Sequence, residues 1–117
     1  MLKIEGIAPN SVLLFYSEFT KHNPINTIKE IEKIYKQEKK DVKFYYLDVT
    51  NEPVLVSAFN IKHTPTIIFI KNFTIADNLV GIVEDDVVEA IKRVHPLKEK
   101  GFFEKIFTWR NDWKLKR

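Results

Sequence analysis

A β-rich run, an amphipathic helix and a second β-rich run follow one another in the first half of the chain. Residues 11–17 form a short, continuous apolar run, which is typical of a strand buried on both faces. From Asn23 and Pro24 to about Glu38, isoleucines recur at helical spacing between charged residues. Residues 42–49 are again rich in β-favouring residues. This order predicts a right-handed parallel strand–helix–strand unit.

The second half of the sequence predicts a short helix, a hairpin and a last helix. A cap and first-turn signature at residues 50–53 begins the short helix. Residues 66–71 and 74–80 are two strands separated by a tight connection, and residues 85–94 carry their apolar side chains on one side of a helix. The 117 residues suffice for one domain with its own core. We therefore expect an α/β fold with a central mixed sheet of four to five strands flanked by helices.

The spacing of these elements resembles the thioredoxin superfamily over about residues 10–95. In that family an isoleucine or valine shortly precedes a cis-proline and a threonine, and a strand, a Lys-Asn turn, a second strand and a glycine follow. The matching residues here are Ile61, Pro65-Thr66, Lys71-Asn72 and Gly81. The resemblance implies a thioredoxin-like fold in which the Thr64–Pro65 peptide bond is cis.

The chemistry of that family requires cysteine, and this sequence contains none. The family's Trp-Cys-Gly-Pro-Cys motif falls on residues 19–23, which read Phe-Thr-Lys-His-Asn. Leu14 stands where the family has a buried aspartate that assists proton transfer, and leucine cannot relay a proton. Because a thiolate is the attacking species in disulfide exchange, we expect no oxidoreductase activity and no cofactor. The protein is interpreted as a non-enzyme.

The resemblance implies a groove that could still bind a partner protein. It would be formed by Phe19, Thr20, Lys21, His22, Asn23, Thr64, Pro65, Gly81 and Ile82. We interpret the chain as a redox-inactive adaptor or chaperone-like module. One alternative is an enzyme that binds a small anion or a glutathione-like peptide at the N-terminus of the first helix, where backbone N–H groups have no partner within the helix. Another is a membrane-peripheral component of a larger assembly. A simpler reading of Thr20 and Asn23 is that they only cap this helix.

Other polar clusters in the sequence carry weaker signals. His22 and His63 would approach each other in such a fold, but without a third ligand we expect no metal. Residues 84–86 (Glu-Asp-Asp) complement a helix dipole more simply than they form a cation site. His95, beside Pro96, is interpreted as the end of the last helix.

The C-terminal segment differs from the rest of the chain in charge. Residues 97–117 hold seven Lys or Arg and three acidic residues, whereas residues 1–96 have a net charge of −1. The domain surface is therefore nearly neutral, and we expect no nucleic-acid binding. The first apolar run is too short for a signal peptide or a membrane span, so the expected location is the cytoplasm.

Residues 97–117 predict a basic amphipathic helix appended to the domain of residues 1–96. Its large apolar side chains would gather on one face, which comprises Phe102, Phe103, Ile106, Phe107, Trp109 and Trp113. Such a face must be covered. Its own domain, a protein partner or an anionic membrane surface could cover it, the last because aromatic residues are combined with Lys and Arg.

Overall fold

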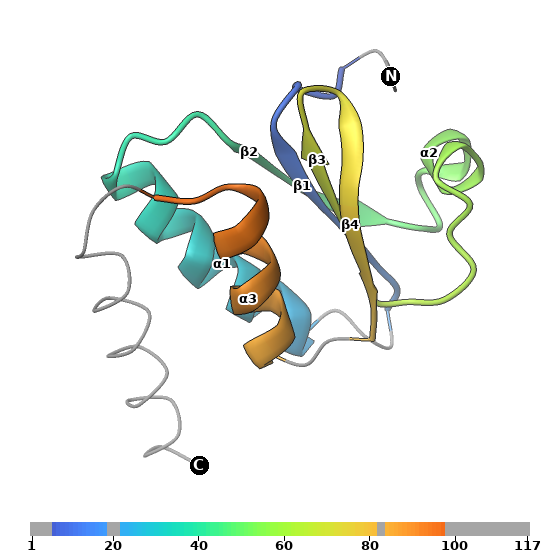
Figure 1. Ribbon diagram of the computed structural model, residues 1–117. Helices are drawn as coiled ribbons and strands as arrows, with labels where there is room; N and C mark the ends of the chain where they lie inside the picture. The colour runs from blue at the N-terminus through green and yellow to red at the C-terminus, as the bar shows by residue number, and fades with distance from the viewer. Residues whose placement is uncertain (1–5, 19–21, 82–83, 98–117) are drawn as a thin grey trace.

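The computed structural model describes residues 6–18, 22–81 and 84–97 (Figure 1). The elements follow the predicted order, and the bounds of the four strands and of the first helix lie within one residue of the predicted ones. They are β1 (Ser11–Tyr16), α1 (His22–Gln37), β2 (Lys43–Asp48), α2 (Pro53–Ala58), β3 (Thr66–Lys71), β4 (Thr74–Val80) and α3 (Glu84–Val94). The predicted C-terminal helix, beyond Leu97, lies outside the described residues.

The described strands form one mixed sheet in the order β2-β1-β3-β4. β1 and β2 are parallel, whereas β1 with β3 and β3 with β4 are antiparallel. A parallel pair needs a crossover connection, and α1 supplies it. Figure 1 shows α1 and α3 together on one face of the sheet and α2 on the other. The predicted α/β fold with a mixed sheet flanked by helices is confirmed.

Two apolar layers cover the two faces of the sheet. Val12 and Leu14 of β1 lie with Ile67 and Phe69 of β3 in the layer under α1 and α3. The alternate residues of the same strands lie in the layer on the α2 side, with Leu47 and Phe59. Because side chains alternate along a strand, a strand buried on both faces must be apolar throughout. This is why β1 and β3 read as continuous apolar runs.

The α2 side of the sheet is only partly covered. α2 has six residues, and none of them is buried. Val80 in β4 is 62% exposed, although the register puts it opposite Thr66. Asn78, opposite Ile68, lies on the same face. The part of β4 that faces the α2 side is therefore open to solvent. No helix in the described parts of the chain has the length and apolar character needed to cross a membrane.

Candidate binding groove and an adjacent hollow

The loop that contains Pro65 joins three elements at one end of the sheet. The Thr64–Pro65 peptide bond is cis, the isomer that the sequence resemblance implies. The Thr64 hydroxyl donates a hydrogen bond of 3.2 Å to Oγ of Ser17, directly after β1. The N–H of Gly81, directly after β4, donates to the Pro65 carbonyl oxygen at 2.8 Å. Thr64, Pro65 and Gly81 of the predicted groove are thereby brought together.

Glycine at position 81 has a conformational reason. Its φ is +72°, in the left-handed region that glycine adopts without steric cost. The N–H of Gly81 continues the ladder of β3 and β4 by donating to Pro65, so the end of β4 and the cis-proline loop hold each other. The sequence pattern indicated this glycine only through the family resemblance.

The other residues of the predicted groove are only partly covered by the structure. Phe19, Thr20, Lys21 and Ile82 lie outside the described residues. His22 and Asn23 begin α1, so their backbone stands at the helix N-terminus, while their side chains are not described. The groove as a whole therefore stays a prediction. Within the described ranges, no group of three or more His, Asp or Glu residues could hold a metal ion.

Leu14 occupies a fully apolar environment. Its side chain is 0% exposed and belongs to the core layer under α1 and α3. At this position the related chemistry would need a titratable group that exchanges protons with the site. Leucine contributes only packing here.

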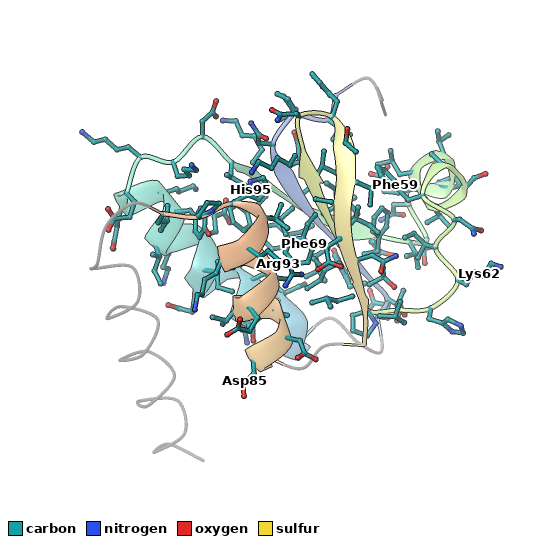
Figure 2. The ribbon with its side chains drawn as sticks, in the orientation of Figure 1. Phe59, Lys62, Phe69, Asp85, Arg93 and His95 are labelled. Carbon is teal, nitrogen blue, oxygen red and sulfur yellow. The ribbon has the colours of Figure 1, made fainter. Side chains whose placement is uncertain are left out.

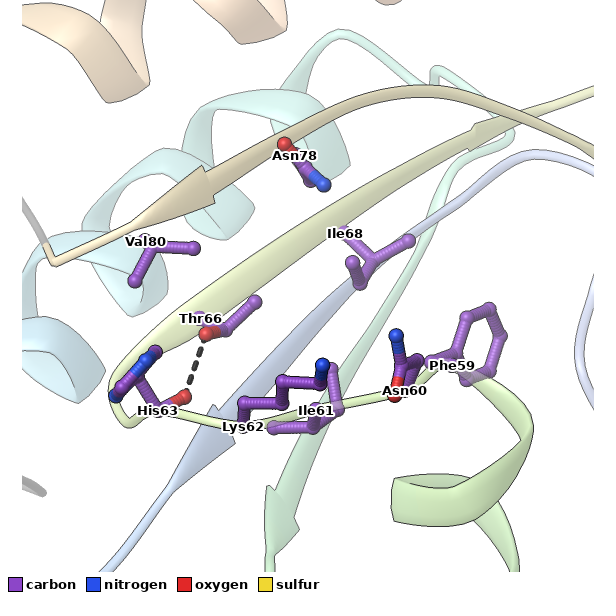
Figure 3. A pocket seen from close by; sticks show the side chains of 9 residues that line it. All are labelled: Phe59, Asn60, Ile61, Lys62, His63, Thr66, Ile68, Asn78 and Val80. Carbon is purple, nitrogen blue, oxygen red and sulfur yellow. Dashed lines mark hydrogen bonds between the residues drawn. The ribbon is translucent and has the colours of Figure 1, made fainter.

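A hollow that the sequence analysis did not predict lies beside the Pro65 loop (Figure 3). Its volume is about 180 Å³. Figure 3 shows the segment from Phe59 to His63 on one side, β4 on the other and β3 between them. The lining residues are Phe59, Asn60, Ile61, Lys62, His63, Thr66, Ile68, Asn78 and Val80. They include the cationic side chain of Lys62 and no carboxylate.

The loop wall of the hollow is fixed by its own hydrogen bonds. The Thr66 hydroxyl donates to the His63 carbonyl oxygen at 2.6 Å, and the Ile61 N–H donates to the Val56 carbonyl oxygen at 2.9 Å. Asn60 adopts a left-handed φ of +54°, which asparagine tolerates better than most residues. The hollow is therefore bounded by a wall that is tied both to α2 and to β3.

Groups with shifted pKa values lie elsewhere in the described structure. Burial raises the pKa of Tyr35 above its ordinary value. Burial, with a hydrogen bond of 2.6 Å to Glu32, also raises the pKa of Tyr46. Burial lowers the pKa of His95. All three belong to the α1 and α3 side or its edge, and none of them lines the hollow. Residues with strongly shifted pKa values are common in enzyme active sites. The three described here lie away from the hollow and so give no sign that it is an active site.

The family model for thioredoxin matches residues 8–93. Thioredoxin H5 from Oryza sativa subsp. japonica is 36% identical over 55 residues, which are 47% of this chain and 41% of that protein. The chain thus matches less than half of that relative's length.

Solved thioredoxin structures share the fold. Thioredoxin f2 from Chlamydomonas reinhardtii aligns with a TM-score of 0.61 at 22% identity, over 80% of this chain and 86% of that chain. Thioredoxin-2 of the malaria parasite aligns with a TM-score of 0.56 at 25% identity, over 72% and 82%. The family match covers most of the sequence, and the sheet, helices and Pro65 loop agree with it. This chain, which has no cysteine, belongs to the thioredoxin family.

Proposed function

We propose that this protein is a redox-inactive thioredoxin-fold module that binds a partner protein at the Pro65 loop. The observation that carries the proposal is the complete absence of cysteine in a chain that keeps the cis-proline loop and its contact with Gly81. Disulfide exchange requires a thiolate, and no other side chain of the twenty replaces it in that reaction. What remains of the ancestral site is a surface that can recognise a polypeptide.

The geometry of the loop supports a recognition role. Thr64 and Pro65 are half-buried, and their loop is tied to β1 through Ser17 and to β4 through Gly81. A preorganised loop loses little conformational entropy when a ligand binds. The same end of the sheet carries the N-terminus of α1, where the first backbone N–H groups of a helix have no partner within the helix itself.

A thioredoxin fold can serve in a protein assembly. Thioredoxin-2 of the malaria parasite, one of the structural neighbours, is a component of the parasite's protein secretion machinery. We propose an analogous adaptor or chaperone-like role for this chain, with the partner held at the groove and, through residues 97–117, at a second contact.

The test is photocrosslinking from the loop. A benzophenone amino acid at position 64 should crosslink a protein in an extract of the source cells, whereas the same group at the exposed Lys36 on α1 should not. The crosslinked protein is then purified and titrated calorimetrically with the wild type and with Thr64→Arg. We expect the bulky, charged Thr64→Arg variant to bind at least about tenfold more weakly. Equal binding by both proteins would move the interface away from this loop.

The alternative function, an enzyme that binds a glutathione-like peptide, makes a different prediction. If the chain binds a glutathione-like peptide, glutathione should shift the amide resonances at the start of α1. It should also compete with the crosslink from position 64. If glutathione binds saturably and the protein also conjugates it to a substrate with turnover, the adaptor proposal is wrong and the chain is an enzyme.

A further inference from the structure

We infer that the hollow between Phe59–His63 and β4 receives one large apolar side chain of a partner protein, and that Lys62 favours an acidic residue next to it. This inference rests on the proposed protein-binding function and adds an anchor point and a sequence preference. The hollow lies on the α2 side of the sheet, beside the predicted groove but lined by different residues.

The size of the hollow indicates which partner side chain it can accommodate. A cavity of about 150 Å³ lined by apolar side chains accommodates benzene. The volume here is about 180 Å³, which suits one aromatic ring or one branched aliphatic side chain. Its base is apolar, because Ile68 is 3% exposed and packs with Phe59 in the core layer on the α2 side. An aromatic side chain placed there would extend that layer over the exposed Val80.

The rim of the hollow selects the residues beside the anchor. The side chains of Asn60 and Asn78 lie on opposite walls, and amides can both donate to and accept from a peptide backbone. Lys62 provides a positive charge, and none of the nine lining residues is acidic. A neighbouring carboxylate on the partner would therefore meet attraction from Lys62 and no repulsion from the lining.

The partner should approach over the face of β4 and not along its edge. In an antiparallel pair, alternate residues of a strand point their N–H groups toward the partner strand. The N–H of Gly81 points toward β3, where it donates to Pro65, so the N–H of Asn78 points away from β3. That N–H already donates to Oδ1 of Asp77 at 2.8 Å. Asp77 is in turn held by Arg93 of α3. The Asp77 carboxylate thus accepts from the Asn78 N–H, a backbone donor on the free edge of β4. A strand added at this edge would need that donor, so its addition is disfavoured.

Capped tripeptides test the inference on the full-length, ¹⁵N-labelled protein. The probe is Asp-Phe-Asp, and the controls are Asp-Ala-Asp and Lys-Phe-Lys. Asp-Phe-Asp should give saturable shifts of the amides of Phe59–His63, Asn78 and Val80. Asp-Ala-Asp should bind at least about tenfold more weakly, because it lacks the buried ring. Lys-Phe-Lys should bind about fivefold more weakly or worse, because it loses the exposed ion pair.

Two variants with the same substitution locate the site. Val80→Asp puts a carboxylate on the wall of the hollow and should abolish binding of Asp-Phe-Asp. Val54→Asp changes a valine of α2 that is more exposed than Val80 and lies outside the hollow, and it should leave binding unchanged. Lys62→Gln should remove the preference for Asp-Phe-Asp over an uncharged Ser-Phe-Ser peptide. The melting temperature of each variant is measured as well, to establish whether a variant that loses binding is still folded.

The outcomes separate this inference from the proposed function. No shift with Asp-Phe-Asp, or equal shifts with Lys-Phe-Lys, would overturn the inference even if position 64 crosslinks a partner. Specific binding of Asp-Phe-Asp without any crosslink from position 64 would support the hollow while contradicting the groove as the interface.

Discussion

The hydroxyl of Tyr35 in α1 donates a hydrogen bond of 2.6 Å to the backbone carbonyl oxygen of His95, directly after α3. Both residues are buried, and the same hydroxyl lies 3.4 Å from the carbonyl oxygen of Ile91. This contact joins the C-terminal ends of the two helices that cover one face of the sheet. It fixes the backbone at the point where α3 ends.

Removal of this hydroxyl should destabilise the fold. Tyr35→Phe leaves the ring in the core but leaves the His95 carbonyl without its partner, so we expect a loss of about 1–2 kcal/mol in the free energy of unfolding. Urea denaturation measures it as a lower midpoint at an unchanged slope. Tyr45→Phe is the matched control, because the Tyr45 hydroxyl also bonds to the backbone but at a less buried position. Equal losses in the two variants would contradict a special role for the buried contact.

His95 should make the stability depend on pH. Burial is the main cause that lowers its pKa below the ordinary 6.5; backbone groups of Ser11 and Ile70 oppose the shift, and the charges of Lys71 and Lys40 add to it. Its Nε2 atom is buried without a hydrogen-bond partner. Tyr35, which bonds to its backbone carbonyl from α1, is neutral below pH 8, because the ordinary tyrosine pKa is near 10 and burial raises it further.

The sign of the effect follows from proton uptake. The unfolded chain binds a proton at His95 near pH 6.5, before the folded chain does, so stability contributed by the neutral imidazole is lost as the pH falls below that value. The slope for one group is at most about 1.4 kcal/mol per pH unit. Denaturation between about pH 8 and pH 5 should therefore show a steeper fall for the wild type than for His95→Leu. His63→Leu, at an exposed position, should retain the wild-type slope.

The elements could be predicted from the sequence because their patterns are local. The apolar runs at residues 11–17 and 66–71 report strands buried on both faces, and the isoleucine spacing reports the inner side of α1. The burial of His95 could not be predicted from such local patterns. His95 was predicted only to end the last helix, yet it is 3% exposed. Its imidazole meets backbone groups of Ser11 and Ile70, which the sheet brings to it from distant parts of the chain.

The hollow was not predicted for a similar reason. The strand pattern at residues 74–80 gave the right bounds but did not say that the α2 side of β4 would lack a helix above it. Only the register, with Asn78 opposite Ile68 and Val80 opposite Thr66, shows which side chains line it. The predicted groove, by contrast, came from the family resemblance, and the described structure brings together Thr64, Pro65 and Gly81 of it.

Restoring the two thiols should restore some chemistry. The family motif falls on residues 19–23, so the double variant Thr20→Cys, Asn23→Cys should reduce the disulfides of insulin, while the wild type should not exceed the buffer blank. Turnover should stay low, because Leu14 offers no proton relay. Thr20→Cys alone is the control, since it lacks a resolving thiol. Reductase activity in the wild type that scales with protein concentration would contradict the redox-inactive assignment.

The C-terminal segment can be tested through its own fluorescence. The chain has two tryptophans, Trp109 and Trp113, and both belong to the predicted tail, so their emission reports on it alone. If the apolar face packs on the domain, emission should be blue-shifted, and deletion from Gly101 should lower the melting temperature. Each large side chain buried there contributes about 1.5–3 kcal/mol before entropy, enough to hold a helix that would be marginal alone.

Emission typical of solvent with an unchanged melting temperature would instead predict that the tail binds another surface. Vesicles of anionic lipid then distinguish the two candidates. A blue shift that salt reverses indicates the membrane, because salt screens the attraction of Lys and Arg to lipid headgroups. No response to vesicles, together with loss of the crosslinked partner on deletion from Gly101, indicates a protein. A deletion that changes neither the melting temperature, nor vesicle binding, nor partner binding would contradict all three roles of the tail.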